Sequence, residues 1–184
     1  ALGFTVYRAE LVNGKWSKWK NMGTAKAEKS SWVDKSAKSG TKYKYTVRAV
    51  NGSTRSTYKA TGELLYLAQP TVTVKVVSNG INVAWTQCAG AKGYRVYRSE
   101  LVNGEWSNWK IMGTAKADKS NWTDKSVTAG VTYRYTVRAV NYDYYGPYKA
   151  TKGMKYDVTP VVTTKNVSDG IKVSWSAVKN ATGY

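Results

Sequence analysis

The sequence of 184 residues contains no histidine and only one cysteine, Cys88. Without histidine the chain has no histidine acid or base, no Ser-His-Asp or Cys-His catalytic arrangement, and no histidine metal ligand. A single cysteine forms neither a disulfide within the chain nor a cysteine zinc site. The 11 acidic residues leave few candidates for a catalytic pair of carboxylates. We therefore expect no catalytic residues, no metal ligands and no cofactor, and we interpret the chain as a non-enzyme.

Long apolar runs are absent as well. The longest comprises the five residues 64–68, whereas a membrane-spanning helix needs about 20. The sequence therefore predicts no transmembrane segment. Hydrophobic residues still make up 42% of the chain, which is typical of a folded globular protein and not of a disordered one.

What the sequence contains instead is an internal repeat of 90 residues. Residues 1–90 align with residues 91–180 without a gap, and 50 of the 90 pairs are identical. The segment ALGFTVYRAELVNGKWSKWK at residue 1 is matched by AKGYRVYRSELVNGEWSNWK at residue 91, and a third copy begins at Ala181. A period of this length is too long for a solenoid unit and long enough for a small domain. The repeat therefore predicts domains in tandem.

Each copy has the pattern of β-strands. Apolar side chains alternate with mostly polar ones in four segments, 43–50, 133–140, 81–85 and 171–175. This two-residue period is typical of strands with one buried face. Asn-Gly or Asp-Gly pairs stand between such runs, at 13–14, 79–80, 103–104 and 169–170. These pairs tolerate the positive φ of type I′ hairpin turns. With no helical stripe anywhere, the pattern predicts an all-β, antiparallel sandwich.

Certain motifs follow one another in a fixed order within a copy. After Pro70 come GINVAW at 80–85, GYRVYR at 93–98, WTD at 122–124 and GVTYRYTVRAVN at 130–141. This order resembles a fibronectin type III domain, in the form repeated in bacterial cell-surface proteins, especially Gram-positive ones. The resemblance implies tandem immunoglobulin-like sandwiches of seven antiparallel strands, A to G, in two sheets. It also implies core positions on strand B for Trp85 and Trp175, and corner tyrosines on strand F at Tyr43 and Tyr133.

The resemblance implies domain boundaries that do not coincide with the ends of the sequence. Residues 1–67 would hold strands C to G of a first domain, residues 68–157 a complete domain, and residues 158–184 strands A and B of a third. A sandwich without strands A and B would expose its core and leave strand edges unpaired. Two interpretations follow. The sequence is a window cut from a longer tandem, or residues 158–184 of one molecule complete residues 1–67 of another by strand exchange, which would build a head-to-tail polymer.

Paired tryptophans between the implied strands C and C′ are the first candidate binding residues. They are Trp16, Trp19, Trp106 and Trp109. In one interpretation they cover the edge of the core, as amphipathic aromatics do; in another they form a platform for a sugar ring. In a third, basic residues of strand F stack on the tryptophan faces as a cation–π ladder. Those basic residues are Arg48, Arg138, Lys44 and Arg134.

The loop between the implied strands F and G differs most between the two copies. It reads GSTRST at 52–57 in one copy and YDYYGP at 142–147 in the other. Binding residues often lie on loops held by a rigid scaffold, so Tyr142, Tyr144 and Tyr145 are further contact candidates. Drift of the loop after duplication is the alternative interpretation.

The formal net charge is +18, and it is spread evenly over the copies. Residues 1–90 carry 14 basic and 4 acidic residues, and residues 91–180 carry 15 and 7. Such a surface attracts polyanions, including acidic glycans and anionic cell-wall polymers, but it also promotes solubility and repulsion between neighbouring domains. No nucleic-acid-binding module is recognisable, so we expect no specific nucleic-acid partner.

These features together favour a structural function. The chain is interpreted as an extracellular, cell-surface or cell-wall-associated repeat that acts as a spacer or fibre-forming module in adhesion, with neighbouring copies of itself as partners. The alternative is a module that binds carbohydrate or an anionic polymer through the tryptophan pairs and the basic surface.

Overall fold

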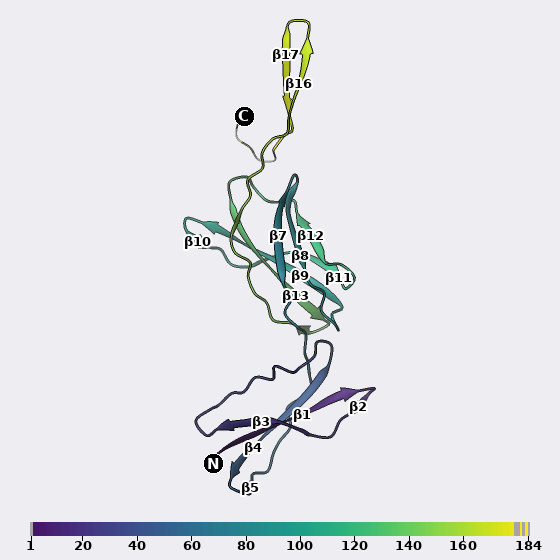
Figure 1. Ribbon diagram of the computed structural model, residues 1–184, viewed down its shortest axis with the longest axis vertical. Coiled ribbons are helices and arrows are strands. Elements are labelled where there is room, and N and C mark those ends of the chain that lie inside the picture. The colour runs from purple at the N-terminus through teal and green to yellow at the C-terminus, as the bar shows by residue number, and fades with distance from the viewer. Residues whose placement is uncertain (1, 179–180, 182, 184) are drawn as a thin grey trace.

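The computed structural model describes residues 2–178, 181 and 183. Within these residues every regular element is a β-strand and every strand pair is antiparallel. The predicted all-β class of tandem antiparallel sandwiches is therefore confirmed. Figure 1 shows an elongated molecule in which three parts follow one another along the long axis: an N-terminal sheet (strands within residues 3–65), a central sandwich (strands within residues 72–155) and a C-terminal hairpin (residues 162–175).

The central sandwich has two sheets. The smaller has the order β12–β8–β7 and is formed by β7 (Val72–Val77), β8 (Gly80–Trp85) and β12 (Asn121–Asp124). In the larger, β9 and β13 pair along eight residues at the centre. Its strands are β9 (Gly93–Val102), β10 (Glu105–Trp106), β11 (Lys110–Lys116), β13 (Thr132–Asn141), β14 (Tyr144–Tyr145) and β15 (Met154–Lys155).

The core lies between these two sheets and is filled by alternate residues of each strand. From the smaller sheet come Ile81, Val83 and Trp85, and the rings of Trp85 and Tyr94 lie 5.3 Å apart. The larger sheet contributes Tyr94, Val96, Tyr133, Tyr135, Val137 and Ala139. The alternation predicted for residues 81–85 and 133–140 therefore marks buried faces. The two corner tyrosines are also where the resemblance implies, because the amides of Lys38 and Thr128 donate to the hydroxyls of Tyr43 and Tyr133 at 2.9 Å.

The N-terminal sheet repeats the larger sheet of the central sandwich, and none of the described residues forms a partner sheet for it. Its strands are β1 (Gly3–Val12), β2 (Lys15–Trp16), β3 (Lys20–Lys26), β4 (Lys42–Asn51), β5 (Thr54–Arg55) and β6 (Leu64–Leu65). Residues 31–34 form no strand, whereas their counterparts 121–124 form β12 on β8. A short strand needs a neighbour for its backbone hydrogen bonds, and among the described residues nothing occupies the place of β8.

The C-terminal hairpin consists of β16 (Val162–Val167) and β17 (Gly170–Trp175), paired in the register of β7 and β8. It projects from the far end of the molecule (Figure 1). Trp85 takes the core position that the resemblance implies, at 5% exposure, but Trp175 is 51% exposed. The difference arises because no second sheet of the described residues lies against β17.

The predicted hairpin turns join strands at all four places, but with two geometries. Asn13 and Gly14, with φ of 49° and 75°, and the equivalent pair at 103–104 have the two positive values of a type I′ turn. In the other two hairpins the turn residues are 78–79 and 168–169, which have no positive φ, while Gly80 and Gly170 begin β8 and β17, so type I′ turns at 79–80 and 169–170 are wrong. Glycine is required at position 80, because a Cβ there would overlap the carbonyl oxygen of Asp124.

Candidate functional site

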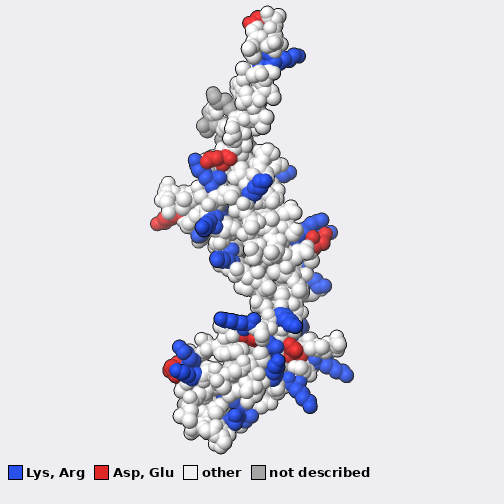
Figure 2. Space-filling view, in the orientation of Figure 1, with Lys and Arg blue, Asp and Glu red and all other residues white. Residues whose placement is uncertain are grey.

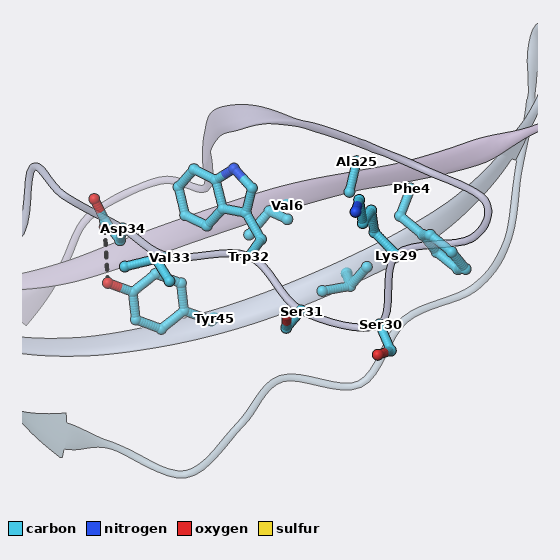
Figure 3. Close-up of a pocket in the computed structure, with 11 residues that line it drawn as sticks. Phe4, Val6, Ala25, Lys29, Ser30, Ser31, Trp32, Val33, Asp34 and Tyr45 are labelled. Carbon is cyan, nitrogen blue, oxygen red and sulfur yellow. Dashed lines mark hydrogen bonds between the residues drawn. The ribbon is translucent and has the colours of Figure 1, made fainter.

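The N-terminal sheet has an open face, which we define by Phe4 and Val6 of β1 and Tyr45 and Val47 of β4. A cavity of about 650 Å³ lies over these four side chains (Figure 3). The counterparts of the four in the central sandwich are at most 1% exposed, whereas Val47 is 49% exposed and Phe4 and Tyr45 are partly exposed. The side chains are those of a sandwich interior, but only Val6, at 5% exposure, is buried, and the other three are at least partly exposed.

Residues 29–34 border the cavity on one side. The indole of Trp32 packs over Gly23, its ring nitrogen 3.7 Å from the place of a Cβ on that glycine, just as Trp122 packs over Gly113. Val33 is 73% exposed. The segment therefore lies close to the path of β12 in the central sandwich although it pairs with no strand of the described residues.

Asp34 fixes the end of this segment. Its carboxylate accepts hydrogen bonds from Arg8 Nη1 and the Tyr45 hydroxyl, each at 2.8 Å, and from the hydroxyl of Ser36 at 2.7 Å. Burial by itself raises the pKa of Asp34, but the bonds from Ser36 and Arg8 outweigh it and hold that pKa well below its usual range. Burial and the bond to Asp34 raise the pKa of Tyr45, which stays protonated and donating.

The same network recurs in the central sandwich. There Asp124 accepts from Arg98 Nη1 at 2.8 Å, from the Tyr135 hydroxyl at 3.0 Å and from the Ser126 hydroxyl at 2.7 Å. The N-terminal network thus forms although no strand of the described residues pairs with residues 31–34. It holds residues 31–34 in place next to the cavity.

The basic residues of β13 do stack on aromatic rings. The Arg134 guanidinium lies 4.3 Å from the ring centre of Trp106 and 5.0 Å from that of Trp109. Arg138 lies 5.3 Å from Tyr145 and 5.4 Å from Tyr148. Trp109 and Tyr148 meet edge to face at 6.4 Å, which joins the two groups into one ladder.

The ladder of the N-terminal sheet is shorter. Lys44 Nζ lies 4.3 Å from the ring centre of Trp16, and Arg48 lies 5.7 Å from that of Tyr58, which contacts Trp19 edge to face. Stacking on tryptophan, predicted for all four basic residues, is therefore found for Lys44 and Arg134, while Arg48 and its counterpart stack on tyrosines. All four tryptophans are partly buried, and their use as sugar platforms stays a prediction.

Sequence reasoning missed Tyr58 and Tyr148, the tyrosines on which Arg48 and Arg138 stack. Tyr58 and Tyr148 each begin the triplet Tyr-Lys-Ala, which is identical in both copies within an otherwise divergent loop. The identity of this triplet in the two copies was the sequence signal that could have indicated these tyrosines. The Nε atoms of Arg48 and Arg138 donate to the carbonyls of Ser56 and Gly146, which fixes the two arginines beside the tyrosines.

The three loop tyrosines have different surroundings. Tyr142 has a φ of 51° at the turn and is 81% exposed. Tyr144 packs against the central core, and the ring of Tyr145 is contacted by Arg95 at 4.9 Å as well as by Arg138. Tyr142 is therefore the tyrosine of the three that projects most freely from the surface.

The remaining expectations concern the distribution of charge, Cys88, metal ligands and membrane-spanning helices. Figure 2 shows Lys and Arg side chains spread over all three parts of the molecule. Cys88 is buried, its thiol donates to the carbonyl of Ala68, and burial raises its pKa. The described residues contain no cluster of three or more His, Cys, Asp or Glu side chains suited to a metal ion. They also contain no helix long and apolar enough to cross a membrane.

The sequence matches no protein-family model and none of the curated proteins. Among solved structures it is similar to a segment of two fibronectin type III domains from chicken tenascin, with a TM-score of 0.48 and 15% identity over 83% of each chain. It is also similar to the FN1–FN3 domains of chicken CNTN1, with a TM-score of 0.44 and 18% identity over 84% of this chain and 57% of that one. For the chicken interferon gamma receptor alpha chain the TM-score is 0.42, with 15% identity over 84% of this chain and 85% of that one.

Proposed function

We propose that the chain is a spacer of the extracellular surface, in which β-sandwich units in series set a fixed distance and serve adhesion. The observation that carries this proposal is the junction between the N-terminal sheet and the central sandwich, where two folded parts meet without a loose linker. The sequence resemblance to fibronectin type III repeats of bacterial surface proteins supports a cell-surface or cell-wall location.

The junction is built from backbone contacts. Gly40 and Gly90, with φ of 84° and 80°, pack directly against each other, and a Cβ on Gly90 would overlap the Cα of Gly40. The Ser39 hydroxyl donates to the carbonyl of Ala89 at 2.7 Å and accepts from the amide of Ala68 at 2.9 Å. Leu67, just after β6, is 2% exposed within the core of the central sandwich. Such contacts resist bending between the two parts.

In a spacer of this kind the β-strands bear the mechanical load, and the function needs no catalysed reaction. Antiparallel pairing and the aromatic core hold the central sandwich together, and the +18 charge keeps neighbouring copies from associating through unspecific contacts. The finer form of the proposal is a fibre in which copies join head to tail by completing each other's sandwiches.

The test compares two glycine variants. Gly90→Ala places a methyl group against the Gly40 backbone, whereas Gly130→Ala, at a nearly equal φ of 82° with nothing within 4 Å, imposes only the backbone strain. The measurement is the distribution of distances between spin labels at the exposed positions 15 and 105, in a Cys88→Val background. We expect a narrow distribution for the starting protein and for Gly130→Ala, and a broader one for Gly90→Ala. A broad distribution in the starting protein would refute the spacer.

A second function is favoured by the ladder of the central sandwich, which combines tryptophan and tyrosine rings with cations on one surface. Carbohydrates and anionic polymers bind to such surfaces through ring stacking and charge. The test is a glycan and anionic-polymer array probed with a Trp106→Ala/Trp109→Ala variant and a matched Trp16→Ala/Trp19→Ala variant. Lost binding with unchanged melting would support the binding module. Lost stability with no ligand bound by the starting protein would support the scaffold.

A further inference from the structure

We infer that two arginines on the outer face of the central sandwich form a binding site for phosphate groups carried on an anionic polymer. They are Arg95 of β9 and Arg138 of β13, which stand opposite each other in the strand pair. The inference deepens the second proposed function, in which the ladder binds an anionic polymer, and rests on it. It adds Arg95 to the ladder and names the chemical group that the site recognises.

Strand alternation places both arginines on the outer face of their sheet. Their neighbours along the strands, which include Tyr94, Val137 and Ala139, are buried in the core, so the two arginines project from the other side. Like charges directly opposite each other on neighbouring strands destabilise a sheet. No carboxylate compensates here, because none of the ion pairs formed by the described residues includes Arg95 or Arg138.

A tyrosine ring holds the two guanidinium groups beside each other. That of Arg95 lies 4.9 Å from the ring centre of Tyr145, and that of Arg138 lies 5.3 Å from it. Arg138 Nε donates to the carbonyl of Gly146 at 2.9 Å, which fixes the orientation of its side chain. Because the arginines are ordered before a ligand arrives, binding costs less entropy.

The N–H groups of the pair are available to a ligand. In the part of the chain that the structure describes, Arg95 donates no hydrogen bond and Arg138 donates only through Nε. A guanidinium donates two parallel hydrogen bonds to a carboxylate or to a phosphate. Thr114 stands opposite Arg95 on β11 and is exposed, so its hydroxyl lies on the same face. This row of donors suits an anion with oxygens in more than one plane, and a phosphate group has them.

The charge around the pair also favours phosphate. The strands β9, β11 and β13 contain a single acidic residue, Glu100, and it pairs with Arg98. A phosphate monoester carries about −1.5 to −2 charges at pH 7 and three acceptor oxygens, whereas a carboxylate or a sulfate ester carries a single negative charge. Two cations that face each other are therefore neutralised best by a phosphate.

The rest of the ladder extends the site along β13. Arg134 lies four residues from Arg138, a rise of about 13 Å along a strand, and stacks on Trp106 and Trp109. Between them lies Tyr148, which contacts both Arg138 and Trp109 and is 48% exposed. A polymer that follows this row meets the arginine pair and then Arg134. Because contacts on one polymer reinforce each other, we expect polymer-bound phosphate to bind more tightly than free phosphate.

The N-terminal sheet repeats these strands without repeating the site. There Thr5 stands opposite Arg48 in place of the arginine pair, and Arg55 takes the place of the tyrosine that holds the pair. Threonine is thus compatible with this position of the sheet. The chain therefore supplies the substitution that removes the site with the least disturbance of the fold.

The test compares the loss of the same side chain at two places. Arg95→Thr introduces the residue of the other copy and removes the arginine pair. Arg55→Thr removes an equal charge at an exposed position of the N-terminal sheet and is the matched control. Arg95→Lys keeps the charge and loses the planar guanidinium. Circular dichroism and melting verify that all three variants fold.

The probes are dextrans of equal length that differ only in their substituent. Dextran phosphate, dextran sulfate, carboxymethyl dextran and unmodified dextran separate phosphate recognition from general charge and from stacking of sugar rings. Inorganic phosphate separates the free group from the polymer-bound one. Affinities are measured by isothermal titration calorimetry in about 150 mM salt, which screens attraction by distant charges. The Nε–H resonances of Arg95 and Arg138 in NMR spectra report whether the site itself is occupied.

We expect dextran phosphate to bind most tightly and to shift the Nε–H resonances of both arginines. Arg95→Thr and Arg95→Lys should each weaken this binding at least about tenfold, because they lose charge-assisted hydrogen bonds. Arg55→Thr should weaken it less than about twofold, because its charge is distant and screened. Equal losses in Arg95→Thr and Arg55→Thr would overturn the inference. So would another dextran, or free phosphate, that binds as tightly as dextran phosphate.

Failure of the arginine site and failure of the binding function give different results. If a dextran binds the starting protein and is lost in Trp106→Ala/Trp109→Ala but not in Arg95→Thr, the ladder binds ligands and the arginine site is refuted. A starting protein that binds none of the probes would also refute the arginine site, and the glycan and anionic-polymer array would then decide the binding function alone.

Discussion

Val47 and Val137 occupy the same position in two copies of one sheet, yet Val47 is 49% exposed and Val137 is fully buried. Each stands opposite a valine of the neighbouring strand, Val6 and Val96. The two positions differ in what packs against them: the smaller sheet of β7, β8 and β12 covers the face that holds Val137, and no strand of the described residues lies over Val47. The exposure of Val47 is thus a property of its surroundings and not of its own strand.

This pair gives the first prediction. Val137→Ala should lower the free energy of unfolding of the central sandwich by about 2 kcal/mol, because two buried methyl groups are lost and a cavity remains. Val47→Ala in dilute protein should change stability by less than about 0.5 kcal/mol. Native-state hydrogen exchange of the amides in β13 and β4 measures the two effects separately. Equal effects would show that the open face is covered in solution.

Asp124 gives the second prediction. Asp124→Asn should cost about 3 kcal/mol, because it removes the buried counter-charge of the Arg98 guanidinium. Arg98 keeps one carboxylate partner, the more exposed Glu100. Urea unfolding at pH 7 measures this cost, and Asp118→Asn, at an exposed aspartate, is the control. A cost below about 1 kcal/mol would show that water replaces the carboxylate.

The same carboxylate predicts how stability depends on pH. Burial by itself raises the pKa of Asp124, but hydrogen bonds from Ser126 and Arg98 outweigh it and leave the pKa below its ordinary value of 3.8. The folded state therefore binds this proton less readily than the unfolded state does. Its contribution should be complete above about pH 4 and lost as the pH falls through the lowered pKa. Urea unfolding between pH 6 and 2 should show a smaller loss for Asp124→Asn than for the starting protein.

The sequence predicted which segments form strands, but it predicted less well which strand faces are exposed and which side chains contact one another there. Period-two alternation located the long strands because every second residue faces a core. The same pattern could not show that Trp175 and Val47 lie exposed, because exposure depends on whether a second sheet is present. The stacking of Arg134 on tryptophan was predicted, because alternation places Arg134 on the outer face of its sheet. That Arg138 meets Tyr148 depends on the path of a loop, which alternation does not determine.

Arg134 gives the third prediction. Arg134→Ala should destabilise the central sandwich by about 1–2 kcal/mol, because it removes two cation–π contacts and uncovers both tryptophans. Lys44→Ala should cost about 0.5 kcal/mol, since Lys44 contacts one tryptophan. Melting followed by near-ultraviolet circular dichroism measures both. An Arg134→Ala variant of unchanged stability that no longer binds glycans would identify the ladder as a ligand surface and not a support.

Tyr142 gives the last prediction. Its φ of 51° is a left-handed conformation, and the other copy has Gly52 at this position with a φ of 57°. That conformation costs a residue with a Cβ about 1–2 kcal/mol, and the greater freedom of glycine in the unfolded chain offsets part of the gain. Tyr142→Gly should therefore stabilise the central sandwich by about 0.5–1 kcal/mol.

The control for this substitution is Tyr142→Ala, which removes the ring but keeps the Cβ and its strain. It should leave the melting temperature nearly unchanged, whereas Tyr142→Gly should raise it by a few degrees. Equal melting temperatures for the two variants would mean that the turn relaxes around Tyr142 and stores no strain. A gain with glycine alone would show that the strain comes from the Cβ and that the ring of Tyr142 does not stabilise the fold. Of the three loop tyrosines, Tyr142 would then be the one to test first for contact with a partner.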